Sequence, residues 1–210
     1  MNNVPFMILL IIILSSCTKR HKTDLQQATV TELSVSKEYY KSDTLAVDLT
    51  RSIIQWKGTK MRGLGKHEGR IELANGFFTI SDGRINGGHF IADMNSITVT
   101  DIPDHEPVPR RRFNNHMKSE DFFDSASYPV SKFEITTVQY KSADSLIVAG
   151  NLTIKEITRN ISFTAKFKDK ALEARFTIDR FQWNIGYKGS WVDKTLVDKD
   201  ILLNFQLFTE

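Results

Sequence analysis

The chain is poor in sulfur: it has one cysteine, Cys17, among 210 residues. A single thiol excludes an intrachain disulfide, so no covalent cross-link holds the fold together. Stability must come from a packed interior instead. The 40% of hydrophobic residues suit one globular domain with a single core.

Long apolar runs are also scarce. The extended run is Val4 to Leu14, which is too short to cross a hydrocarbon layer of ~30 Å as a helix. It suits the hydrophobic region of a secretion signal. No Lys or Arg lies between Met1 and Cys17, so the positive region of that signal is reduced to the amino terminus.

The segment after this run, Leu14-Ser15-Ser16-Cys17, resembles the lipobox of bacterial lipoproteins. The resemblance implies that residues 1–16 are a lipoprotein signal peptide and that Cys17 is lipidated after cleavage. Residue 18 is Thr rather than the Asp that favours the inner membrane, so we expect a lipid anchor in the outer membrane of the cell envelope, facing the periplasm. The alternative is an ordinary signal peptide followed by a free thiol.

Residues 17–45 are polar and show little apolar periodicity, which predicts a flexible tether between the anchor and the domain at 46–210. The basic cluster at Thr18–Lys22 stands beside the lipidated position. It either lies against anionic headgroups or is part of a solvated linker.

Charge of one sign is not in excess, since the net charge is only +3. No Lys and Arg run is interleaved with aromatic residues that stack on bases, so we expect no nucleic-acid partner. We also expect no cofactor and no metal site, because the five histidines show no ligand spacing. They are His21, His67, His89, His105 and His116.

From Ala46 onward, apolar residues recur with a period of two, which predicts β-strands with one apolar face. Turn residues at Asn75-Gly76, Ser81-Asp82-Gly83, Asn86-Gly87-Gly88 and Lys168-Asp169-Lys170 predict short antiparallel connections. The alternating positions are Ile54 and Trp56; Phe90, Ala92 and Met94; Phe133 and Ile135; Leu146, Val148, Gly150, Leu152 and Ile154; Ile161, Phe163, Ala165 and Phe167; Leu172, Ala174, Phe176 and Ile178; Ile201, Leu203, Phe205 and Leu207.

About eight such strands form either a sandwich or a closed barrel. Small residues on the predicted inner face, such as Ala92, Gly150 and Ala165, favour a barrel with a lumen, although tight packing also places small residues against large ones. The stretch Asp101–Pro109 has three prolines and is excluded as a central strand. Residues 113–122 are predicted to form a short helix in this connection.

Two segments resemble the YceI-like, lipocalin-like lipid-binding proteins. NHMKSEDFFDSASYP at 114–128 is similar to their H-x-x-S-x-D-F-F-D-x-x-x-Y-P segment, and 150–159 is similar to G-[ND]-L-T-I-x-G-[VI]-T-[KR]. Further blocks follow in the family's order at 56–58, 66–69, 87–97 and 178–185. Glu156 stands where the family usually has Gly, and a positive φ there would strain it.

The resemblance implies an all-β fold: an elongated, antiparallel, eight-stranded lipocalin-like barrel with one short helix in a connection. It also implies binding of long apolar molecules, such as polyisoprenoids, quinones or fatty-acid-like lipids, for transport, storage or sensing, without catalysis. A homodimer is left open. The residues expected to line the cavity are Trp56, Phe90, Met94, Phe133, Ile135, Phe163, Phe167, Phe176 and Phe205.

Basic residues beside the predicted helix are candidates for a polar or diphosphate headgroup at the mouth of the barrel, because guanidinium groups offer forked donors. The alternative is a solvated stretch that offsets Asp101, Asp104 and Glu106. The mouth candidates are Arg110, Arg111, Arg112 and His116.

Two other functions compete with lipid binding. One is an interaction or stress protein of the envelope with a filled core. The other is a hydrolase that uses Ser119, His116 and Asp121, yet three residues so close on one short helix rarely reach triad geometry, and no G-x-S-x-G elbow occurs.

Overall fold

The structure is a computed structural model that describes residues 25–34, 43–186 and 196–210. The predicted signal peptide, Cys17 and the basic cluster at Thr18–Lys22 lie outside the described residues. Among the described residues, no helix has the length and apolar character needed to cross a membrane.

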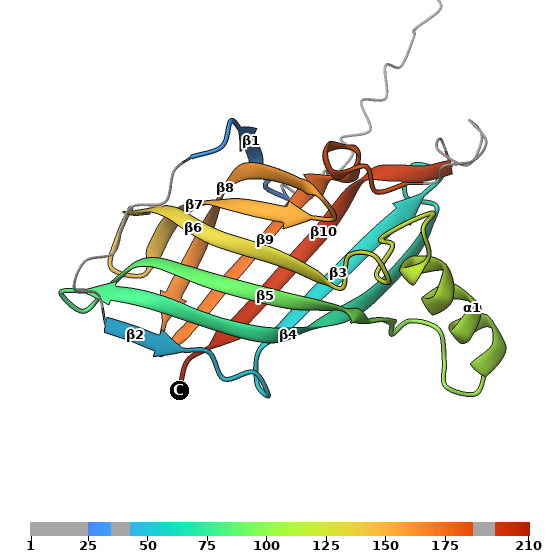
Figure 1. Ribbon diagram of the computed structural model, residues 1–210, viewed down its shortest axis with the longest axis horizontal. Helices are drawn as coiled ribbons and strands as arrows, with labels where there is room; N and C mark the ends of the chain where they lie inside the picture. Colours follow the sequence, from blue (N-terminus) through green and yellow to red (C-terminus); the bar gives the residue numbers. More distant parts are fainter. Residues whose placement is uncertain (1–24, 35–42, 187–195) are drawn as a thin grey trace, which may run out of the picture.

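Eight antiparallel strands form a closed barrel, as expected (Figure 1). Each strand from β3 to β10 pairs with the next one along the chain. β10 also pairs with β3, and this pairing closes the ring. The strands are β3 (Ile53–Lys60), β4 (Gly65–Ser81), β5 (Arg84–Val99), β6 (Val130–Tyr140), β7 (Ser145–Ile154), β8 (Ile157–Lys168), β9 (Ala171–Asp179) and β10 (Val197–Phe208).

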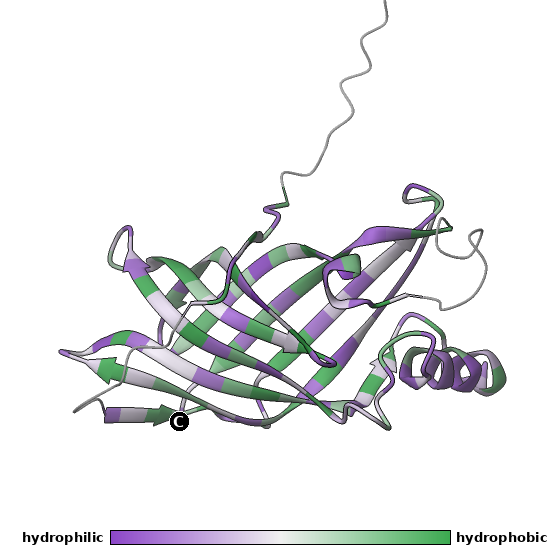
Figure 2. Cartoon of the chain, turned by 45° about the horizontal axis from the view of Figure 1, so that its top comes forward, coloured by the Kyte–Doolittle hydropathy of each residue, from purple (hydrophilic) through white to green (hydrophobic). Residues whose placement is uncertain are grey.

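The alternation of apolar and polar residues explains why these segments close around a core. Along β7, Leu146, Val148, Gly150, Leu152 and Ile154 are buried, whereas the residues between them are half-buried. The bands of hydrophobic and hydrophilic residues along each strand are visible in Figure 2. Because successive side chains point to opposite faces of a sheet, one face of every strand turns toward the barrel interior.

Two of the four predicted turns are turns in the structure. Asp82-Gly83 connects β4 to β5 and Asp169-Lys170 connects β8 to β9, with φ values of 52° and 72°, and of 51° and 64°. Positive φ at both residues matches the right-handed twist of the paired strands.

The other two predicted turns are wrong, because Asn75-Gly76 lies inside β4 and Asn86-Gly87-Gly88 lies inside β5. A register shift between Leu73 and Asn75 marks a β-bulge, where Ala74 and Asn75 are both exposed. The bulge restores the inward direction of the following residues, so β4 continues as one long bent strand.

The expected strain at Glu156 is absent, because the positive φ of the β7–β8 turn falls on Lys155 at 55°. The Glu156 carboxylate instead accepts a hydrogen bond from the Tyr128 hydroxyl, and this bond is the main reason why the pKa of Tyr128 is raised. Glu156 thus ties the β7–β8 turn to the segment that precedes β6.

The helix in the proline-rich connection begins earlier than predicted. α1 spans Pro107–Lys118, with prolines in its first turn, and Ser119 is its C-cap. Proline is excluded from a helix interior but not from the first turn, where its missing N–H has no helical acceptor. A short 3-10 helix, η1 (Arg180–Trp183), follows β9. Figure 1 places α1 beside one end of the barrel.

Two short strands lie outside the barrel ring. β1 (Thr29–Thr31) pairs with β8, and β2 (Asp43–Ala46) pairs with β4. Ala28 N also donates to Thr177 O at 2.8 Å. The structure therefore differs from the expected tether in its described part, since residues 26–31 lie against the barrel wall.

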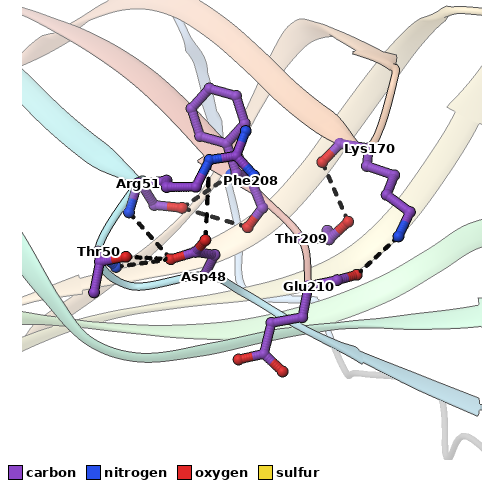
Figure 3. A network of polar contacts seen from close by, with 8 residues as sticks. Asp48, Thr50, Arg51, Lys170, Phe208, Thr209 and Glu210 are labelled. Atoms are coloured by element: carbon purple, nitrogen blue, oxygen red, sulfur yellow. Dashed lines mark hydrogen bonds and ion pairs between the residues drawn. The ribbon is translucent and has the colours of Figure 1, made fainter.

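A polar turn at residues 48–52 joins β2 to β3 at the end of the barrel opposite α1 (Figure 1), and Figure 3 shows its contacts. The Asp48 carboxylate accepts bonds from the Thr50 hydroxyl at 2.7 Å and from the Thr50 and Arg51 backbone N–H groups at 3.0 and 3.1 Å. The guanidinium of Arg51 lies 4.5 Å from the centre of the Phe208 ring. These contacts connect the start of the barrel to its last strand.

Candidate ligand cavity

A cavity of about 360 Å³ lies inside the barrel. Most residues around it are apolar, and they come from all eight barrel strands and from α1 and the segment after it. A well-packed interior leaves few voids larger than a water molecule. The size of this space therefore indicates a binding site rather than a packing defect.

Eight of the nine predicted cavity residues line this space: Trp56, Phe90, Met94, Phe133, Ile135, Phe163, Phe176 and Phe205. Phe167 is not among the described lining residues. It is half-buried near the β8–β9 turn, where its ring centre lies 6.1 Å from that of Phe78. Whether the lining residues contact a ligand stays a prediction.

Six phenylalanine rings form a belt around the cavity. The rings come in order from β4, β5, β6, β8, β9 and β10: Phe78, Phe90, Phe133, Phe163, Phe176 and Phe205, with successive centroid distances of 5.0, 6.4, 5.7, 4.1 and 5.6 Å. Such offset and tilted contacts are favourable beyond the area that they bury. The aromatic belt is thus a stable part of the cavity wall.

Glycine makes room for the aromatic wall at two positions. A Cβ at Gly150 on β7 would lie 2.5 Å from the Phe133 ring and from the Glu134 carbonyl oxygen. A Cβ at Gly69 on β4 would lie 2.6 Å from the Trp56 indole and would also collide with the Thr98 carbonyl. Both glycines belong to the sequence blocks that carry the family resemblance, and both are needed for close approach.

The polar lining residues gather at one end of the cavity, which we call the α1 end. Lys60, Lys66 and His67 lie at the β3–β4 hairpin, and Asp198 lies beside them on β10. The opposite end is apolar, with Phe78, Leu172 and Leu207. The cavity is therefore amphipathic along its length.

Helix α1 lies over part of this polar end of the cavity. The Phe113 ring stacks on Trp56 with centroids 6.2 Å apart and lies 4.3 Å from the His67 ring. His67 Nδ1 is 3.4 Å from Asp101 Oδ1. His116 and Met117 follow on the same helix and also line the cavity.

Arg180 is fully buried at the same end and lines the cavity. Its guanidinium donates to the carbonyl oxygens of Ile185, Val197 and Asp198 at 2.6, 3.0 and 3.1 Å. A buried cation is tolerated only when it is well hydrogen-bonded. Arg180 therefore fixes the segment after β9 against the start of β10.

The three arginines that we expected at the mouth of the barrel are not among the described residues that line the cavity. They are on α1 rather than in a loop. Arg110 forms an ion pair with Asp104, and Arg111 and Arg112 are exposed. The pairing of Arg110 agrees with the alternative in which this basic stretch offsets nearby acids. His116 is the candidate of this group that reaches the cavity.

The structure does not bring Ser119 into a triad with the His116 imidazole. The Ser119 hydroxyl donates to the His116 backbone carbonyl at 2.8 Å, and so caps the end of α1. Among the residues with described positions, no three His, Cys, Asp or Glu side chains gather in a way that could hold a metal ion.

Sequence reasoning missed several lining residues. Phe78 is missed because Asn75-Gly76 is interpreted as a turn, so the second half of β4 is not recognised as strand. Phe113 is assigned to the predicted helix, but the sequence does not indicate that its side chain lines the cavity. The alternation of Ile71 and Leu73 before the bulge was the available signal for β4.

The fold and the cavity define a class of small antiparallel barrels with an internal apolar site. A family model described as a YceI-like domain matches residues 45–208, and the chain belongs to this family. A UPF0312 protein from Shewanella denitrificans is 26% identical over 97 residues, or 46% of this chain and 47% of that protein. The chain thus matches about half the length of that relative.

Solved structures share the fold. Burkholderia cenocepacia BcnA has a TM-score of 0.64 and 20% identity, covering 77% of this chain and 98% of that one. A polyisoprenoid binding domain from Saccharophagus degradans, implicated in plant cell wall breakdown, has a TM-score of 0.58 and 14% identity, covering 81% of this chain and 99% of that one.

Proposed function

We propose that this protein binds one long apolar molecule with a polar head inside the barrel. The observation that carries the proposal is the cavity of about 360 Å³ in the place where a filled core would be packed. An interaction protein with a filled core would have no need of this space. The cavity therefore favours ligand binding over that alternative.

The distribution of polar lining residues orients the ligand. The tail lies in the aromatic belt and reaches toward Phe78 and Leu207, where burial removes apolar surface from water. The head lies at the α1 end, beside Lys60, His67 and His116, where a hydroxyl, carbonyl, carboxylate or phosphate oxygen finds donors.

The ligand class that we propose is a polyisoprenoid, a quinone or a fatty-acid-like lipid. The fold shared with the polyisoprenoid binding domain of Saccharophagus degradans supports this class. Burial of one CH₂-sized group contributes roughly 0.8 kcal/mol, so an isoprene unit contributes ~3–4 kcal/mol. Association costs about 4–15 kcal/mol, so only a ligand with several units is bound tightly.

We further propose that the protein works in the cell envelope, where it carries, stores or senses this lipid. The resemblance of Leu14–Cys17 to a lipobox supports an anchor on Cys17 and a position on the outer membrane facing the periplasm. One acyl chain binds membranes only marginally, whereas the several chains of a lipoprotein anchor bind firmly. Cys17→Ser should abolish incorporation of labelled palmitate, and unchanged incorporation would refute the anchor.

Mass spectrometry of an organic extract from natively purified protein tests the proposed function. We expect one lipid class in near-stoichiometric amount, together with its loss from a variant whose cavity is filled. A protein that carries no lipid and takes up none after addition of prenyl alcohols, quinones and fatty acids would contradict the proposal.

A further inference from the structure

Four large apolar side chains are exposed together at the α1 end of the barrel. Leu64 is 84% exposed and Met61 is 52% exposed at the tip of the β3–β4 hairpin. Phe181 on η1 and Leu196 before β10 are 45% and 44% exposed. We call Met61, Leu64, Phe181 and Leu196 the apical patch.

Hydrogen bonds connect the parts of the apical patch. Met61 N donates to Leu196 O at 2.8 Å, which joins the hairpin to the start of β10. Arg180 bonds the Val197 carbonyl, and its guanidinium carbon lies 4.2 Å from the centre of the Phe181 ring. The four residues therefore belong to segments that are bonded to one another at this end of the barrel.

The hairpin tip is held rigidly in an outward conformation. Met61, Arg62 and Gly63 have positive φ values of 52°, 58° and 90°. The Asp198 carboxylate fixes this conformation, since it accepts from the Arg62 and Gly63 N–H groups at 3.0 Å each and from the Thr59 hydroxyl at 2.5 Å. Large apolar side chains that are exposed together, unlike single ones, mark an interaction site.

Cations outnumber carboxylates at the hairpin of the patch. The hairpin segment from Lys60 to Lys66 contains Arg62 as a third cation and no acidic residue. Lys66 lies 3.7 Å from Glu68, whereas Lys60 and Arg62 form no ion pair with any residue that the structure describes. The Asp198 carboxylate, which accepts the hydrogen bonds of the hairpin, offsets one of these cations, so the hairpin keeps a net positive charge.

We infer that the apical patch docks on the surface of an anionic lipid bilayer. Apolar side chains on a tip enter the headgroup region, and basic residues beside them are attracted to anionic lipids. Lys60 and Lys66 belong both to this hairpin and to the cavity lining. Docking therefore brings the polar end of the cavity to the membrane surface, so that a lipid passes between bilayer and barrel without crossing water. This last consequence rests on the proposed function.

A fluorescent probe at the hairpin tip tests the docking. The full-length chain carries Cys17→Ser, so that an environment-sensitive dye attaches only to Leu64→Cys. The matched control is Ala143→Cys, which is exposed in the β6–β7 turn at the opposite end of the barrel. Vesicles of phosphatidylglycerol and phosphatidylethanolamine contain a spin-labelled lipid as quencher.

We expect a blue shift and strong quenching for the probe at 64, and neither for the probe at 143. This comparison is informative even if residues 4–14 bind the vesicles, because it measures which end of the barrel meets the lipid. Equal responses at the two positions, or no response at 64, would overturn the inference. A blue shift that grows with protein concentration without vesicles would also overturn it, in favour of a second copy of the chain as the partner.

Two variants separate the contributions of charge and apolar contact. Lys60→Gln with Arg62→Gln should reduce the quenching at 64 severalfold on anionic vesicles, whereas Lys141→Gln with Lys168→Gln at the opposite end should not change it. Met61→Asp should abolish the quenching and leave the lipid content of the purified protein unchanged. Quenching that survives both tip variants would refute the docking.

The two proposals fail separately. A protein that contains no lipid but still shows quenching at position 64 would refute the proposed function and leave the docking in place. A protein that contains lipid but shows no quenching would refute the docking alone.

Discussion

Gly69 shows how a single missing side chain shapes the cavity wall. Gly69→Ala places a methyl group against the Trp56 indole and the Thr98 carbonyl, and the backbone oxygen cannot move aside. Overpacking of this kind costs about 1–3 kcal/mol. We expect this loss in the free energy of unfolding measured with denaturant.

Gly58→Ala is the matched control for this substitution. Gly58 lies on the neighbouring strand, paired with His67, and a Cβ there meets no atom within 4 Å. We expect the free energy of unfolding of this variant to lie within ~0.5 kcal/mol of the wild-type value. Equal destabilisation by the two variants would show that the glycine at 69 is not required for packing against Trp56.

Ala174 tests whether the cavity is used. It lines the cavity on β9 beside Phe205, so Ala174→Phe fills the space that we assign to the tail. We expect the affinity for a long-chain lipid to fall at least tenfold while the protein stays folded, as measured by fluorescence titration and circular dichroism. Ala149→Phe, which adds the same ring on the outer face of β7, should bind the long-chain lipid with wild-type affinity. Equal affinities for the two variants would count against the cavity as the site.

Individual residues were predictable where the period of two is uninterrupted. From Leu146 to Ile154 the alternation alone assigns the inner face, and the structure buries all five expected positions. Phe167 follows the same pattern and packs against the core, but it lies near the end of β8 and is not among the described lining residues. The periodicity of the sequence predicts on which face of a strand a side chain lies, but not how far along the barrel axis it lies.

At the scale of elements, α1 lies over part of the polar end of the cavity. Phe113 connects it to the barrel wall through Trp56 and His67, and Asn114 connects it to β5 by two hydrogen bonds. Each aromatic pair is worth about 0.5–1.5 kcal/mol, so Phe113→Ala should speed ligand release roughly tenfold. Stopped-flow displacement of a fluorescent polyene fatty acid measures this rate.

Val108→Ala is the control for α1, since Val108 is exposed on the same helix. Its release rate should equal that of the wild type. If Phe113→Ala also releases ligand at the wild-type rate, α1 is not part of the exit path.

The turn at Asp48 is the element whose stability depends on acid. The hydrogen bond from the Thr50 hydroxyl is the largest cause that lowers the pKa of Asp48 below its ordinary value of 3.8. A lowered pKa stabilises the fold above pH 3.8, and this contribution is lost as the pH falls through the pKa of the folded state. Asp48→Ala should therefore destabilise the protein at pH 7, and the difference from the wild type should shrink below pH 3.8. A difference that is independent of pH, in urea unfolding across this range, would contradict the assignment.

Elements were harder to predict wherever a local signal has two meanings. Asn75-Gly76 has the composition of a turn, but here Gly76 packs beneath Phe90 in a bulged strand. Pro107 and Pro109 exclude a strand and equally suit the first turn of a helix, so the start of α1 was predicted too late. In both cases the local sequence is compatible with two structures, and tertiary contacts decide which of them forms.

At the scale of the whole molecule, closure of the barrel is the feature that short-range patterns leave open. A sandwich and a barrel have the same alternation, and the pairing of β3 with β10 across most of the chain decides between them. The family resemblance correctly predicted the barrel. The apical patch was not predicted, because exposed residues at a hairpin tip carry no periodic signal.

A titration of delipidated protein with prenyl alcohols of increasing length tests the central claim most directly. If the tail fills the cavity, affinity rises steeply with each added isoprene unit, by roughly 3–4 kcal/mol at most, and then reaches a plateau when the cavity is full. The plateau should come at a shorter chain in Ala174→Phe. Affinity that is independent of chain length, or equal plateaus in the two proteins, would contradict the account.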